Sequence, residues 1–225
     1  MKTGVLLSGC GVFDGTAIHE AVCALLSLKQ NNLEYICIAP DISQHHVLNH
    51  VSGEEIQQKR NVLLESARIA RGNIRSLDEL DYNEINSLVI PGGFGAAKNL
   101  SDWAFNGPES TVNKDVKKLL HHCLESSKPI VALCIAPTLL AKTLVKEKQG
   151  SLTVGSTKSP SEYNIEEIHQ AMNTLGINTQ ETTINEICVD EENKIITAPC
   201  YMMDVGIDEV YDNIKQAINR LVQML

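Results

Sequence analysis

The chain has 225 residues, of which 43% are hydrophobic, and carries a formal net charge of −9 at neutral pH. No apolar run approaches the ~18 to 20 residues needed to cross a bilayer, so the sequence predicts no membrane span. The acidic balance argues against a nucleic-acid binder, because phosphate recognition uses clustered lysines and arginines. Small molecules or other proteins are the expected partners.

Seven cysteines form an odd set with no CxxC pair and no alternation with histidine at the spacing of zinc sites. No targeting segment is visible ahead of the first expected strand. These features predict free thiols and no metal, and they lead us to expect a protein of the reducing cytoplasm.

Short β-branched runs alternate with helix-length segments of 3.6-residue periodicity, a pattern typical of βαβ units around a mainly parallel sheet. Strands are expected over 4–8 and 35–39, with a helix from about residue 18 to 26 between them. A further helix is expected over 61–71 and a further strand over 85–90. The length suits one α/β domain.

Residues 41–80 depart from simple alternation, and we interpret them as an insertion in a single domain spanning 1–225. His45, His46 and His50 lie there in a polar stretch. We expect this insertion to cover or border the functional site.

The second half of the chain resumes the alternation. Residues 116–124 predict an amphipathic helix, and 129–133 form a continuous apolar run typical of a strand buried on both faces. Pro137 can start the next helix, which is expected to run to about Lys146. The remaining expected elements are a short strand at 152–154, a helix near 161–175, a β-hairpin of 187–189 with 195–197, and a closing helix over 207–222. The expected fold is an α/β sandwich with helices on both faces and a C-terminal β-hairpin.

Cys134 follows the buried strand immediately and precedes the helix at Pro137. A nucleophile on such a strand-to-helix elbow projects from the carboxyl edge of the sheet, where open α/β sheets bind ligands. The helix N-terminus is expected to stabilise the thiolate, and lowering an ordinary thiol pKa of about 8.5 by about two units would make thiolate the main form. The alternative is that Cys134 is a small buried hydrophobic residue. The strand, turn and helix around Cys134 favour the interpretation of this residue as a nucleophile.

A glycine-rich loop, PGGFG at 91–95, follows another expected strand. If the two strands are neighbours, the backbone N–H groups of Gly92 and Gly93, with that of Ile135, would form an oxyanion hole. The alternative is that the glycine pair only turns the chain.

The loop 9–15 follows the first strand and opens a helix, as a dinucleotide-binding loop does. However, Asp14 stands where the fingerprint needs its third glycine, and a carboxylate there would repel a pyrophosphate. We therefore expect no cofactor. Asp14 and Glu20 are instead candidate acid–base groups for the thiol, with helix capping or a surface role as the alternative.

No histidine lies between Val131 and Tyr163, so the simplest Cys–His pair is missing. The remaining histidines would reach the thiol only through folding. The usual machinery of a cysteine protease is not evident.

Seven motifs spread over nearly the whole chain match one known family. They are SGCGVFDG at 8–15, IHE at 18–20, RNVL at 60–63, ESARIARG at 65–72, PGGFGAAKNL at 91–100, CIAP at 134–137 and TAP at 197–199. With these motifs the chain resembles the ElbB family of isoprenoid-biosynthesis or lycopene-enhancing proteins. That family belongs to the ThiJ/PfpI branch of the class I glutamine amidotransferase-like proteins.

The resemblance implies a flavodoxin-like fold, an elbow cysteine at Cys134 and a homodimer. It also implies a weak, cofactor-independent glyoxalase activity that converts glyoxal-type dicarbonyls to hydroxy acids. Two departures argue against amidotransferase and peptidase activity. Residues 197–201 do not match the histidine–glutamate pair of glutamine amidotransferases, and Ile135 stands where PfpI-type peptidases have a histidine.

Two hypotheses of different classes follow. The first is a glyoxalase-like enzyme that acts through Cys134. The second is a module that binds a metabolite without turnover, or senses redox state through Cys134. A hydrolase of amides or esters is a third and less favoured hypothesis, because the triad is missing.

Overall fold

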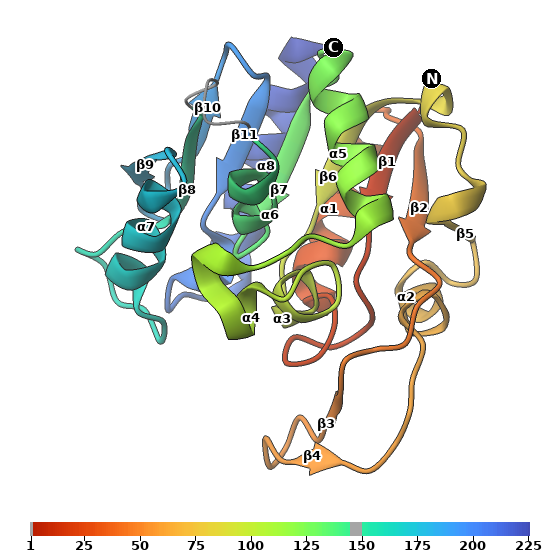
Figure 1. Ribbon diagram of the computed structural model, residues 1–225. Helices are drawn as coiled ribbons and strands as arrows, with labels where there is room; N and C mark the ends of the chain where they lie inside the picture. Colours follow the sequence, from red (N-terminus) through yellow and green to blue (C-terminus); the bar gives the residue numbers. More distant parts are fainter. Residues whose placement is uncertain (1, 145–149) are drawn as a thin grey trace.

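A computed structural model describes residues 2–144 and 150–225, and the expected helix end near Lys146 lies outside them. In this part of the chain seven strands form a central sheet between two layers of helices, in the order β10-β11-β7-β6-β1-β2-β5 (Figure 1). The strands are β1 (Lys2–Leu6), β2 (Tyr35–Ala39), β5 (Ile74–Ser76), β6 (Ile85–Ile90), β7 (Ile130–Leu133), β10 (Cys188–Asp190) and β11 (Ile195–Ala198). All neighbours pair in parallel except the antiparallel β10 and β11. The mainly parallel sheet and the C-terminal hairpin are as predicted.

Both faces of the sheet are buried, because successive side chains of a strand point to opposite sides. Val5 and Leu7 belong to one hydrophobic cluster and Leu6 to the other. The first cluster is covered by α1 (Ile18–Gln30), α2 (Val62–Ile69) and α8 (Ile207–Met224). The second is covered by α3 (Phe94–Lys98), α5 (Lys114–Glu125) and α6 (Pro137–Thr143). No described helix is long and apolar enough to cross a membrane.

The strand order reverses at β1, which places a ligand-binding crevice at its carboxyl end. From β1 the chain adds β2 and β5 on one side and then β6, β7 and β11 on the other. Open α/β sheets bind ligands outside the carboxyl ends of the strands at such a point. Since β6 pairs with both β1 and β7, the loops after these three strands meet.

The segment 41–80, expected to be an insertion, is divided by the structure. The small hairpin of β3 (Val47–Leu48) and β4 (Glu55–Ile56) projects from the body (Figure 1). By contrast, α2 packs on the sheet and β5 extends it as a parallel edge strand. Only the part before α2 leaves the layers, and the rest continues the βαβ alternation.

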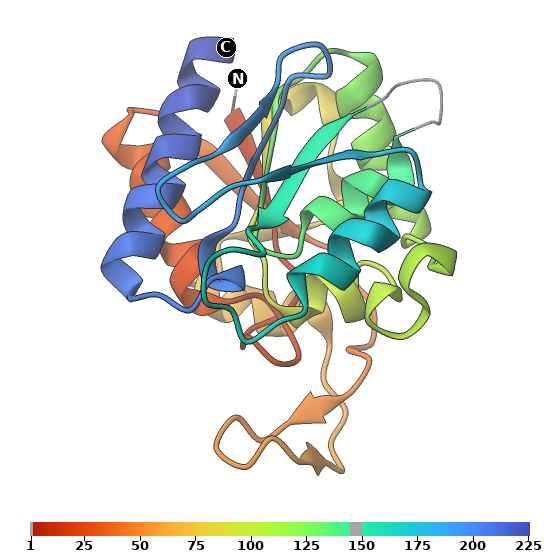
Figure 2. The same cartoon turned by 90° about the vertical axis from the view of Figure 1, so that its left-hand side faces the viewer.

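A smaller unit lies beside the end of the sheet formed by β10 and β11, on the side that faces the viewer in Figure 2. It consists of the parallel pair β8 (Ser151–Gly155) and β9 (Asn178–Glu181) with α7 (Ile165–Thr174). The remaining short helices are η1 (Leu77–Glu79), η2 (Tyr82–Glu84), α4 (Trp103–Asn106), η3 (Gly107–Glu109) and η4 (Cys200–Met202). Of these elements, α4, η3, η4 and α7 border the carboxyl end of β7.

Asn213 of α8 fixes the turn that follows β11. Its side-chain oxygen accepts a hydrogen bond from the N–H of Cys200 at 3.1 Å, and its amide nitrogen donates to the carbonyl of Glu186 at 2.9 Å. The side chain is 1% exposed, so no water can replace it. One buried backbone N–H and one partly buried carbonyl therefore depend on one amide.

Replacing Asn213 with alanine should lower the free energy of unfolding by about 1–3 kcal/mol, because the buried N–H of Cys200 loses its partner and the carbonyl of Glu186 must turn to water. Urea denaturation followed by circular dichroism measures this. The control is Gln216→Ala on the exposed face of the same helix, which should stay within about 0.5 kcal/mol of the wild type. Equal losses in the two variants would contradict the role of Asn213.

Candidate functional site

Cys134 occupies the turn between β7 and α6 with a φ of 58°, in the left-handed region. A residue with a Cβ is strained there by about 1–3 kcal/mol, and such strain is held only by firm surroundings. The N–H of Cys134 donates to the carbonyl of Ala198 at 2.9 Å, which ties the turn to β11. The sequence placed the elbow at this residue, and the backbone has the geometry of one.

Glu20 lies in the first turn of α1 and is completely buried. Its Oε2 accepts a hydrogen bond from the N–H of Gly92 at 2.8 Å, and its carboxyl group lies beside the thiol of Cys134, close enough for each group to shift the pKa of the other. Three separate segments thus meet at one carboxyl group. The structure brings Glu20, one of the two candidate acid–base residues, to the sulfur.

Gly92 is required by the closeness of these groups. A Cβ at this position would lie 2.4 Å from the Cβ of Cys134, 2.9 Å from its sulfur and 2.8 Å from Oε2 of Glu20. Real Cβ atoms do not approach so closely, so any side chain here would push the thiol and the carboxyl group apart. The glycine pair of the PGG loop therefore does more than turn the chain.

Of the three N–H groups expected to form an oxyanion hole, one already has a partner. The N–H of Gly92 is already used by Glu20, so it is not free for a substrate oxygen. The N–H groups of Gly93 and Ile135 lie close enough to the sulfur of Cys134 to lower its pKa. An oxygen formed on a carbon bound to that sulfur would lie next to these two donors.

The expectation of a lowered pKa at Cys134 is wrong. Burial raises the pKa of this thiol well above its usual value, and the neighbouring charge of Glu20 raises it further. The N–H groups of Gly93 and Ile135 lower the pKa but do not outweigh burial. The resting thiol is therefore protonated at neutral pH.

Burial also raises the pKa of Glu20, to about 7, although the N–H of Gly92 and the thiol of Cys134 lower it. A carboxyl group with this pKa exchanges its proton near neutral pH. That is the property of an efficient general acid–base group.

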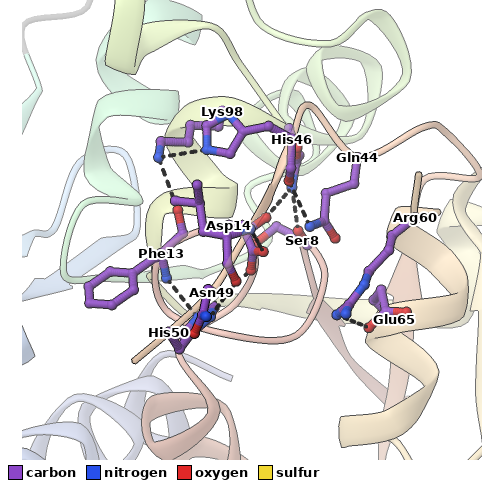
Figure 3. A network of polar contacts seen from close by, with 12 residues as sticks. Ser8, Phe13, Asp14, Gln44, His46, Asn49, His50, Arg60, Glu65 and Lys98 are labelled. Carbon is purple, nitrogen blue, oxygen red and sulfur yellow. Dashed lines mark hydrogen bonds and ion pairs between the residues drawn. The ribbon is translucent and has the colours of Figure 1, made fainter. Parts of the chain in front are cut away.

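Asp14, the other candidate, lies in a separate polar network (Figure 3). Its side chain is buried, and its Oδ2 accepts a hydrogen bond from the N–H of Leu48 at 2.8 Å. Nε2 of His50 lies 3.8 Å from its Oδ1. Asp14 thus joins the loop after β1 to the β3–β4 hairpin instead of contacting Cys134. Sequence could not separate Asp14 from Glu20, because both follow the first strand closely.

A cavity of about 380 Å³ opens at Cys134, in the size range of small-molecule sites. Its remaining lining residues are Val12, Gly93, Phe94, Ala97, Trp103, Ala104, Phe105, Gly107, Pro108, Ile135, Tyr163, Glu167, Ile168, Ala171, Tyr201 and Met202. Sequence reasoning missed most of this lining. The residues come from separate segments and form no local motif.

A second cavity, of about 500 Å³, adjoins the first across Val12, Tyr163 and Tyr201. His19 and His50 line it, and Nδ1 of His19 lies 3.0 Å from the hydroxyl of Tyr201. The hairpin segment thus borders the region through His50. Within residues 2–144 and 150–225, no three metal-ligating side chains are grouped so that they could hold a metal ion.

Comparison with known proteins places these features in a family. The model of the DJ-1/PfpI family matches residues 11–203. The mitochondrial ES1 protein homolog of Rattus norvegicus is 38% identical over 99% of this chain and 84% of its own length. The mitochondrial glutamine amidotransferase-like class 1 domain-containing protein 3 of Homo sapiens is 37% identical over 99% of this chain and 83% of its own length.

The crystal structure of an isoprenoid biosynthesis protein with an amidotransferase-like domain from Ehrlichia chaffeensis has the same fold. It is 30% identical, covers both chains completely and superposes with a TM-score of 0.89. This likeness confirms the predicted flavodoxin-like fold.

The expectation of a cytoplasmic protein is wrong on this comparison, because the names of the rat and human relatives place them in mitochondria. That expectation was based on the prediction of free thiols, and all seven cysteines are indeed free. Free thiols indicate a reducing compartment and do not distinguish one such compartment from another.

Because the pKa of Glu20 is raised in the folded protein, this residue should make the folded state less stable as the pH increases. Between about pH 4.5 and 7 the folded protein holds a proton that the unfolded chain has released, so its stability falls as the pH rises. The contribution of this group is roughly 3 kcal/mol over that range. In Glu20→Gln this part of the decline should be absent, as measured by urea denaturation at pH 5, 6, 7 and 8.

The control is Glu192→Gln, at an exposed position, which should keep the pH dependence of the wild type. An unchanged pH dependence in Glu20→Gln would show that Glu20 titrates as an ordinary solvated carboxyl group.

Proposed function

The chain belongs to the DJ-1/PfpI family, and we propose that it is a glyoxalase-like enzyme that converts dicarbonyls to hydroxy acids through Cys134. The observation that carries this proposal is the buried contact of the Cys134 thiol with Glu20, whose pKa is about 7. The proposal includes the finer assignment to ElbB-type proteins. That assignment is supported by the long shared motifs and by the likeness to a protein named for isoprenoid biosynthesis.

The first step is attack of the sulfur on an aldehyde carbon. As the S–C bond forms, the carboxylate of Glu20 takes the thiol proton and the electron pair of the C=O bond moves to the oxygen. The N–H groups of Gly93 and Ile135 stabilise this oxyanion. Return of the proton from Glu20 to the oxygen completes a hemithioacetal and restores the carboxylate.

The second step moves one proton between two carbons. The carboxylate of Glu20 removes the hydrogen of the former aldehyde carbon as a proton and passes it to the neighbouring carbonyl oxygen, which gives an enediol. The hydroxyl group on the sulfur-bearing carbon then loses its proton to Glu20 while the neighbouring carbon gains one, which gives a thioester of a 2-hydroxy acid. One carbon is oxidised and the other reduced, so the step needs no external oxidant. Water cleaves the thioester, releases the hydroxy acid and returns the proton to sulfur.

The rival hypothesis of a redox sensor is less well supported. Peroxide reacts with thiolates, and the pKa of Cys134 is raised by burial. Amidotransferase and peptidase chemistry also lacks support, because those mechanisms need a histidine beside the thiol and none is among the described residues that line the cavity at Cys134.

Substitution of the two central residues should affect turnover differently. Cys134→Ala should abolish conversion of glyoxal and methylglyoxal, because no S–C bond can form. Glu20→Gln should reduce kcat/KM by about 10² to 10⁴-fold, since the thiol proton loses its acceptor. Formation of glycolate or lactate by the purified proteins provides the measurement.

The matched control is Cys10→Ser, since Cys10 is the one cysteine of the seven with a partly exposed side chain. It should retain wild-type turnover. Wild-type rates in Cys134→Ala would refute the proposal. Selective oxidation of Cys134 by mild peroxide, together with negligible turnover by the wild type, would favour the sensor instead.

The pH dependence of turnover should follow the ionisation of Glu20. Its carboxylate is the active form, so kcat/KM should fall as the pH decreases through about 7. This titration should be missing from the residual activity of Glu20→Gln. A half-maximal pH near 4.5 in the wild type would exclude Glu20 as the base.

A further inference from the structure

The cavity at Cys134 is much larger than glyoxal needs. At about 380 Å³ it lies within the range of pockets that enclose a complete drug-sized ligand. A substrate as small as glyoxal would leave most of this space filled with water. The volume of the cavity therefore indicates a substrate larger than glyoxal, which the reacting groups alone do not.

The aromatic residues of the chain are concentrated in this cavity. The sequence has three phenylalanines, one tryptophan and five tyrosines, and five of these nine line the cavity. They are Phe94, Trp103, Phe105, Tyr163 and Tyr201. The rings of Phe94 and Tyr163 meet edge to face with centroids 5.9 Å apart. Aromatic walls of this kind favour flat, apolar groups.

Trp103 and Phe105 belong to α4, which has no part in the sheet. Trp103 is 7% exposed, whereas Phe105 is 49% exposed and packs against His45, with ring centroids 4.4 Å apart. A half-exposed phenylalanine beside a cavity gives it an apolar border. The apolar wall of the cavity thus extends from Cys134 to the half-exposed ring of Phe105.

The charges of the lining point the same way. No lysine, arginine or histidine is among the described lining residues, and Glu167 is the one carboxylate there. Lys98 lies nearby, with its Nζ 4.7 Å from the centroid of the Phe94 ring, but its ammonium group already donates to the carbonyl of Phe13. The lining itself offers a phosphate or carboxylate no cation, and Glu167 would repel it. Apart from Glu167 and the hydroxyl groups of Tyr163 and Tyr201, the polar groups that can act on a ligand are those at Cys134: its thiol, Glu20 and the two N–H donors. The best ligand is therefore neutral, with a reactive polar head and an apolar body.

From this arrangement we propose that the preferred substrate is an α-oxoaldehyde with a bulky, uncharged, flat apolar substituent. The aldehyde meets Cys134, and the substituent occupies the cavity among Phe94, Trp103 and Tyr163. This inference rests on the proposed function. It adds the substrate class, which neither the thiol nor the carboxyl group specifies.

The test compares phenylglyoxal with methylglyoxal, which share the reacting group and differ in the substituent. In the wild type, kcat/KM for phenylglyoxal should be higher by at least about tenfold, the scale that burial of extra apolar atoms provides. Ala171→Phe places a ring in the cavity and should reduce this ratio severalfold. Gln170→Phe, on the exposed face of the same helix, should leave the ratio unchanged.

A binding measurement separates the two proposals. Calorimetry on Cys134→Ala should show that 2-hydroxyacetophenone binds at least about tenfold more tightly than hydroxyacetone, its methyl counterpart. Equal affinities, or Cys134-dependent turnover that prefers methylglyoxal, would overturn the inference and leave the proposed function standing. Turnover of neither aldehyde would overturn both.

Discussion

The arrangement of the rest of the site depends on the buried contact between Glu20 and Cys134. The two acidic groups are buried against each other, and burial is the largest cause that raises the pKa of each. Two negative charges there would repel strongly, so the pair carries at most one at neutral pH. The lack of a side chain at Gly92 and the positive φ of Cys134 are both needed to bring the groups this close. A charge that moves between oxygen and sulfur suits proton transfer at carbon, which is why we favour a glyoxalase-like reaction.

The fold assembles this contact from distant segments because β1, β6 and β7 are neighbours. The helix after β1 supplies Glu20, the loop after β6 supplies Gly92 and Gly93, and the turn after β7 supplies the sulfur. α8 then holds the turn after β11 through Asn213, and that turn contributes Tyr201 to the cavity. The reacting groups thus lie on the rigid sheet edge. The apolar walls come from the short helices around it, which can vary without disturbing the chemistry.

Much of the fold was predictable from sequence because its signals are local. The apolar run before Cys134 indicates a buried strand, and Pro137 indicates the helix that follows. β5 was missed since it has three residues, including the polar Arg75 and Ser76. Glu20 and Asp14 could not be separated, because the choice depends on which way each side chain points after folding. The pKa of Cys134 was predicted in the wrong direction, since the helix end can be read from the sequence but complete burial cannot. The aromatic cavity was missed for a related reason, because Phe94, Trp103, Tyr163 and Tyr201 share no spacing.

The protonation state of Glu20 tests the central claim most directly. Infrared difference spectra between the wild type and Glu20→Gln, recorded from pH 5 to 9, isolate the carbonyl stretch of the protonated carboxyl group. We predict that this band is present in acid and disappears with a midpoint near pH 7. A midpoint near 4.5, the value of a solvated glutamate, would contradict the account, because the carboxyl group would then not be the buried partner of the thiol.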